Sequence, residues 1–190
     1  MIPDRAEIIR SLTGAIRLAR LDAGGMALFN VTLAGFWRSF FAAVLVAPVY
    51  LVLIALNPSP GDQAIAFEIK AVREVVFYAA GWAIFPVIMI PIARFLDLGP
   101  RYVGYIIAYN WAQVPMILLW LPIEVAGAIG VLPEALLSIL SLAATLAIVG
   151  YLYVITRIAL GTPMMTAIAI VVIEFLSGVV LFGLKQTLIA

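Results

Sequence analysis

Between Glu134 and Arg157 the chain reads ALLSILSLAATLAIVGYLYVIT (residues 135–156), which is 22 residues without one charged side chain. About 20 mostly apolar residues in a helix cross the roughly 30 Å hydrocarbon core of a bilayer. This stretch therefore predicts a membrane-spanning helix that ends at Arg157.

The whole chain has the same character. Of its 190 residues 66% are hydrophobic and only 11% are charged, and the mean hydropathy is +1.20. A soluble domain has about 25% charged and 45–50% apolar residues, and a globule of this size could not hide so much apolar surface from water. The composition also excludes a disordered chain and a secreted disulfide scaffold. The formal net charge of +1 argues against nucleic acid as a partner.

Four more apolar runs of spanning length occur in the chain. The five predicted spans are residues 39–56, 75–93, 102–123, 135–156 and 164–184. Their connections are short, so consecutive spans should lie antiparallel as neighbours in one bundle. We therefore predict an all-α polytopic membrane bundle over residues 26–190, preceded by an N-terminal segment over residues 1–25.

The basic residues set the expected orientation of the bundle, because Lys and Arg concentrate in cytoplasmic loops. With the N-terminus in the cytoplasm, eight arginines fall inside: Arg5, Arg10, Arg17, Arg20, Arg38, Arg94, Arg101 and Arg157. Three basic residues fall outside: Lys70, Arg73 and Lys185. We expect a bacterial-type inner (plasma) membrane protein with a cytoplasmic N-terminus and a periplasmic C-terminus.

The N-terminal segment has the pattern of an amphipathic helix. One face of a helical wheel carries Ile8, Ile9, Leu12, Ile16 and Ala19. Arg10 and Arg17 lie on the opposite face, so the helix is expected to lie in the membrane interface. Four arginines are then candidates for contact with lipid headgroups: Arg10, Arg17, Arg20 and Arg38. In the alternative interpretation the helix packs under the bundle with its arginines in water.

Residues 26–36 are apolar but would make the first span about 30 residues long. We interpret this segment as an interfacial elbow, with Trp37 and Arg38 at the level of the headgroups. A re-entrant or strongly tilted start of the first span is the alternative.

Glu174 is the most unusual residue of the predicted spans. It lies 11 positions after Pro163, which is about 16 Å deep at 1.5 Å per residue. A charged carboxylate facing lipid at that depth costs at least a few kcal/mol, so we expect Glu174 to face protein, protonated or hydrogen-bonded. It is either a ligand for an ion, proton or substrate or a polar contact between two helices.

Polar residues of two other spans reach a similar depth. Asn110 and Gln113 lie three positions apart on the third span, and Thr145 lies near the middle of the fourth. If they converge on Glu174, they form one buried midplane site. The alternative is a set of ordinary hydrogen bonds between helices, each contributing about 0.6 kcal/mol.

Enzyme chemistry is disfavoured by two absences. The chain contains no Cys and no His, which removes thiol nucleophiles, His general bases and the commonest ligands of catalytic metals. It also lacks a glycine-rich phosphate loop and a nucleophile elbow. We expect a protein that is not an enzyme and has no cofactor or metal.

The plan of a cytoplasmic N-terminal segment, five close spans and a short outer C-terminus resembles the YIP (Ypt-interacting protein) type of membrane protein. The resemblance covers residues 20–190 and includes Gly35-Phe36-Trp37-Arg38 and Gly104-Tyr105. It implies a five-span helical fold and no catalytic residue. Eukaryotic members bind prenylated Rab GTPases, but the acidic–aromatic stretch that they carry before the first span is not evident here, so that activity is not carried over.

Two functions follow as hypotheses. The first is an accessory or scaffolding membrane protein that binds lipid, other membrane proteins or further copies of itself. The second is a small transporter or ion-conducting protein that uses the midplane site around Glu174.

Overall fold

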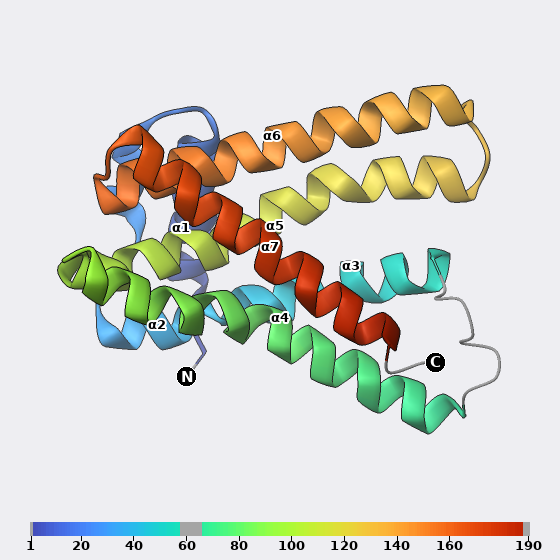
Figure 1. Ribbon diagram of the computed structural model, residues 1–190, viewed down its shortest axis with the longest axis horizontal. Helices are drawn as coiled ribbons and strands as arrows, with labels where there is room; N and C mark the ends of the chain where they lie inside the picture. Colours follow the sequence, from blue (N-terminus) through green and yellow to red (C-terminus); the bar gives the residue numbers. More distant parts are fainter. Residues whose placement is uncertain (1, 58–65, 188–190) are drawn as a thin grey trace.

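The computed structural model describes residues 2–57 and 66–187, and within these ranges all regular structure is helical. Figure 1 shows the elements in chain order: α1 (Arg5–Ala19), η1 (Ala23–Leu28), α2 (Leu33–Ser39), α3 (Phe41–Leu56), α4 (Phe67–Phe95), α5 (Gly99–Ala128), α6 (Glu134–Leu160) and α7 (Met164–Thr187). The predicted all-α class is confirmed. Residues 58–65 and 188–190 of the predicted 26–190 domain lie outside the described residues.

Five helical stretches are long and apolar enough to cross a bilayer. They are Leu33–Leu56, in which α2 and α3 follow one another, and the single helices α4, α5, α6 and α7. The described residues thus contain the five candidate spans that the sequence predicts, and these helices indicate an integral membrane protein.

The first candidate span begins six residues before the predicted start at Ser39. The Thr32 hydroxyl accepts a hydrogen bond from the Gly35 backbone amide at 3.0 Å and so caps the N-terminus of α2. A break at Phe40 separates α2 from α3. The ambiguous segment 26–36 is therefore divided between the end of η1, an extended link and the start of α2.

Glycine is required where α2 meets this extended link. A Cβ atom on Gly35 would collide with the backbone carbonyl oxygen of Asn30. The chain can fold back this tightly only because residue 35 has no side chain.

The fourth helix also starts earlier than the predicted span, at Phe67 rather than Val75. The predicted start is later because the first turns of α4 contain charged residues. Such residues interrupt an apolar run in the sequence, but they do not interrupt the helix. Glu74 is only 8% exposed, and it is paired with Arg73 and with Lys185 of α7.

The core of the molecule surrounds α5. Residues 104–112 of this helix are buried without interruption. In the apolar 18-residue stretch that makes it a candidate span, 44% of the residues are buried, against 11–22% in the other candidate spans. Helices α1, α2, α3, α4 and α6 all contact α5. The outer sides of α4, α6 and α7 expose large apolar residues such as Val87, Leu146 and Val179, as helices in contact with lipid do.

Helix α1 crosses one end of this bundle, at which α4 turns into α5 and α6 turns into α7 (Figure 1). Ala15 and Leu18 of α1 are fully buried, and the Tyr151 hydroxyl of α6 donates to the Ala15 carbonyl at 2.7 Å. The predicted apolar face is turned partly away from the bundle, because Ile9 and Ile16 are 55% and 44% exposed.

The α6–α7 turn at the same end depends on a glycine. Gly161 ends α6 in the left-handed conformation, with φ at 59°, which favours glycine. Arg101 of α5 donates from Nη1 to the Leu160 carbonyl at 2.5 Å, and a Cβ atom on Gly161 would collide with this guanidinium. The arginine thereby satisfies a carbonyl at the negative end of the α6 dipole.

Candidate functional site

A cavity of about 560 Å³ lies between α3, α4, α5 and α7, at the level of the candidate spans. Its walls are mostly apolar and aromatic, and its two charged residues are Glu174 and Lys185 of α7. Gly81, Gly178 and Phe182 line the cavity and are also exposed. The cavity is therefore open on the side of the bundle, where these exposed residues lie.

Glu174 forms part of the cavity wall, and α5 holds its carboxyl group. The Tyr109 hydroxyl donates to Oε1 of Glu174 at 3.0 Å. The other oxygen, Oε2, accepts no hydrogen bond from the described residues. It is also not one of the polar atoms that are buried without a hydrogen-bond partner, so it is accessible. One oxygen is thus fixed by the protein and the other is accessible from the cavity.

Aromatic side chains form the wall that α3 and α4 contribute. The rings of Tyr50 and Tyr78 lie 4.6 Å apart between centroids, and Tyr78 lies 6.3 Å from Trp82. The Tyr78 hydroxyl donates to the Ala43 carbonyl at 2.6 Å, which fixes its ring. Trp120 of α5 adds a further indole ring to the lining. These rings make much of the cavity wall aromatic.

The end of the cavity near the C-terminus of α7 carries a cluster of charges that are already paired. Lys185 Nζ lies 2.7 Å from Glu74 Oε2, and the Tyr50 hydroxyl donates to the same oxygen at 3.1 Å. Arg73 binds the other oxygen of Glu74 at 2.9 Å. The ion pairs and hydrogen bonds of this cluster link α3, α4 and α7 to one another.

A second cavity of about 370 Å³ lies against the first, toward α6. Both cavities are lined by Gln113, Glu174 and Gly178, and Thr145 belongs to the second alone. A Cβ atom on Gly178 would meet no atom within 4 Å. A side chain at this position would therefore occupy space that the glycine leaves empty.

The four predicted midplane residues are only partly brought together. Glu174, Gln113 and Thr145 share the adjoining cavities, although the Thr145 hydroxyl donates to the Ser141 carbonyl of its own helix at 2.8 Å. Asn110 is fully buried on another side of α5, where its Nδ2 donates to Ser39 Oγ at 2.9 Å. No hydrogen bond within the described residues joins Glu174 to Asn110, Gln113 or Thr145.

Sequence reasoning missed Tyr109, which supplies the hydrogen bond to Glu174. The available signal is spacing: Tyr105, Tyr109 and Gln113 recur every four positions, which places polar groups along one face of α5.

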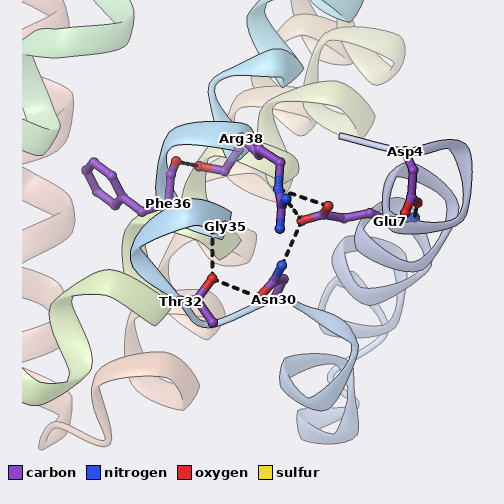
Figure 2. A network of polar contacts seen from close by, with 8 residues as sticks. Asp4, Glu7, Asn30, Thr32, Gly35, Phe36 and Arg38 are labelled. Carbon is purple, nitrogen blue, oxygen red and sulfur yellow. Dashed lines mark hydrogen bonds and ion pairs between the residues drawn. The ribbon is translucent and has the colours of Figure 1, made fainter. Parts of the chain in front are cut away.

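A second polar network lies at the α1 end of the bundle (Figure 2). Glu7 of α1 is 7% exposed, and Arg38 of α2 binds it with Nε 3.0 Å from Oε2. Asn30 donates to Glu7 Oε1 at 3.2 Å and accepts from Thr32 at 3.0 Å. The network ties α1 to the start of the first candidate span.

The predicted headgroup-binding arginines thus fall into two groups. Arg38 is paired with Glu7, and Arg17 is paired with Asp22 through Nε at 2.6 Å. The hydrogen bonds from Arg17 and from the Gly24 amide hold the pKa of Asp22 below its ordinary value. Arg10 and Arg20 are exposed and have no ion-pair partner among the described residues.

The described residues contain no group of three or more acidic side chains that could hold a metal ion. Comparisons with protein-family models, with curated proteins and with solved structures give no match to this chain.

Proposed function

We propose that the chain is a non-enzymatic membrane protein that binds an amphiphilic molecule, such as a membrane lipid, in the cavity between α4, α5 and α7. The observation that carries this proposal is the side opening of the cavity at Gly81, Gly178 and Phe182. Because the opening lies within the candidate spans, a ligand enters from the bilayer rather than from water. Apolar walls with a few polar groups are typical of small-molecule sites.

The proposed orientation has the N-terminus in the cytoplasm of a cell with a bacterial-type inner membrane. It is supported by the exposed arginines at the end of the bundle where α1 lies: Arg10, Arg20, Arg94, Arg101 and Arg157. Cytoplasmic loops carry such an excess of basic residues.

At this end α1 acts as an amphipathic interfacial helix in our proposal. Ile9 and Ile16 face the acyl chains, and Arg10 and Arg20 contact anionic headgroups at about 1 kcal/mol each. The support is the exposure of both isoleucines while another face of α1 packs on the bundle. Spin labels at single cysteines should report acyl-chain depth at positions 9 and 16 and water at position 10. Equal water exposure at all three positions would contradict the interfacial placement.

The amphiphile proposal is tested by native mass spectrometry of the purified protein in mild detergent. Gly178→Phe places a ring in the cavity, so the retained lipid should be lost. Gly183→Phe is the matched control, since Gly183 is also exposed on α7 with no atom within 4 Å of an added Cβ, and it lines neither cavity. Equal lipid retention in both variants would contradict the proposal.

A transporter is the second candidate, because a carboxyl group at the wall of an intramembrane cavity is typical of substrate and ion pathways. A flux assay in liposomes comparing wild type with Glu174→Gln separates the two functions. Flux that depends on Glu174 supports transport, and the absence of flux in lipid-binding protein supports a binding or scaffolding role. The expected protein partners and the resemblance to YIP-type proteins stay predictions.

A further inference from the structure

We infer that the preferred ligand of this cavity is a lipophilic organic cation, whose positive centre lies beside Glu174. This inference rests on the proposed ligand-binding function of the cavity and specifies the charge of its ligand.

The charge distribution within the cavity is the first argument. Lys185 lies 2.7 Å from Glu74 and is therefore compensated within the protein. Glu174 has no basic partner among the described residues, and its one hydrogen bond comes from the neutral hydroxyl of Tyr109. Glu174 and Lys185 are eleven positions apart on α7, which is about 16 Å at 1.5 Å per residue. The acidic group left for a ligand to neutralise is thus Glu174, and a cation bound beside it would stabilise the ionised carboxylate.

The accessible oxygen gives this charge a point of contact. Oε2 of Glu174 accepts no hydrogen bond from the described residues and is not sealed from the cavity. Because Tyr109 already holds the carboxyl group in place, binding of a cation does not carry the entropic cost of ordering this side chain. A ligand amine or other cationic centre can therefore contact Oε2 while Oε1 keeps its bond to Tyr109.

The aromatic lining favours the same class of ligand. Cations bind over the faces of Trp and Tyr rings, and such rings form the sites that recognise quaternary ammonium groups. The lining supplies Tyr50, Tyr78, Trp82, Tyr109 and Trp120. An anionic ligand would meet the electron-rich faces of these rings and the carboxylate of Glu174.

The position within the bilayer selects a lipophilic cation over a small hydrated one. Exposed residues within the candidate spans, such as Gly81 and Gly178, line the cavity, and a compact ion that enters from the bilayer loses most of its hydration. A cation whose charge is surrounded by hydrocarbon groups enters with the membrane lipids and loses little hydration.

Tetraphenylphosphonium and tetraphenylborate test this inference, because they have nearly the same size and opposite charge. Equilibrium dialysis in one non-ionic detergent measures the Kd of each for wild type, Glu174→Gln, Glu134→Gln and Gly178→Phe. Gln preserves the size of Glu174 and an acceptor for Tyr109. Glu134→Gln is the matched control, since it removes one exposed carboxylate at the start of α6 outside both cavities.

We expect Glu174→Gln to weaken tetraphenylphosphonium binding by about tenfold or more, as loss of a contact to a charged group does. Glu134→Gln should bind as wild type does, Gly178→Phe should not bind, and tetraphenylborate should bind wild type less tightly than tetraphenylphosphonium does. A Glu174→Asp variant keeps the charge and should retain part of the affinity, which separates loss of charge from loss of folding.

Two results would overturn the inference while leaving the proposed function intact. One is unchanged affinity in Glu174→Gln with loss of binding in Gly178→Phe, which indicates a neutral amphiphile. The other is equal affinity of wild type for the two probes. Unchanged binding in Gly178→Phe would overturn both the inference and the proposed cavity site.

Discussion

The Tyr109 hydroxyl lies 3.0 Å from Oε1 of Glu174, and this contact joins two residues that are 65 positions apart in the chain. Tyr109 belongs to α5, the most buried of the candidate spans, and Glu174 belongs to α7 at its side. The bond therefore holds the carboxyl group of Glu174 against the buried helix α5, at the wall of the cavity.

Removal of this hydroxyl should destabilise the bundle modestly. We expect Tyr109→Phe to lower the free energy of unfolding by about 0.5–1.5 kcal/mol, the range for hydrogen bonds between membrane helices. Unfolding by SDS titration of the detergent-solubilised protein measures this change. Tyr153→Phe is the control, since the Tyr153 hydroxyl has no hydrogen bond to the described residues. Equal effects of the two substitutions would show that the contact contributes no stability.

Two glycines, Gly161 at the end of α6 and Gly150 within it, should respond differently to substitution by alanine. Gly161→Ala should cost about 1–3 kcal/mol, because it combines a strained left-handed residue with a clash against Arg101. Gly150→Ala in the same helix should be neutral or stabilise by up to about 1 kcal/mol, because its Cβ meets open space. The same SDS titration compares them, and similar changes in both variants would contradict the turn geometry.

The ion pair between Glu7 and Arg38 should be energetically coupled. Each single substitution to Gln leaves a partner without its charge, so we expect a loss of about 1–3 kcal/mol for Glu7→Gln and for Arg38→Gln. The double variant should lose less than the sum of the two. Arg20→Gln at an exposed position serves as the control, with an expected change within about 0.5 kcal/mol. Additive losses would show that the pair does not hold α1 to α2.

Reporter fusions test the proposed topology. Fusions after Asn57, Leu98, Gly130 and Gly161 should report outside, inside, outside and inside, in that order. The four positions lie between the five candidate spans. Any other order would refute the proposed orientation or the number of spans crossed.

The number of spans could be predicted from the sequence because each is a long apolar run, and hydropathy averages over many residues. The helix ends could not be predicted, because the charges that end an apolar run can be paired across the bundle. Glu74 remains inside α4 because Lys185, 111 residues further along the chain, lies 2.7 Å from it. A local window cannot detect such a partner.

The sequence gives the position of the candidate site residues along their helices but not the direction in which each side chain points. Asn110 and Tyr109 differ in depth by only about 1.5 Å, but one residue turns a helical side chain by about 100° around the axis. Tyr109 therefore contacts Glu174 while Asn110 points to Ser39. The direction depends on how α5 is rotated among the helices around it, and apolar residues on all its sides give the sequence no preferred face.

Photo-crosslinking in membranes tests the central claim, that an amphiphile occupies the cavity. A lipid with a diazirine in its acyl chain should label cavity residues such as Trp82 and Trp120 as well as outward-facing residues such as Leu146. Gly178→Phe should abolish the labelling of the two tryptophans and leave that of Leu146 unchanged, as measured by peptide mass spectrometry. Labelling confined to outward-facing residues in the wild-type protein would contradict the claim.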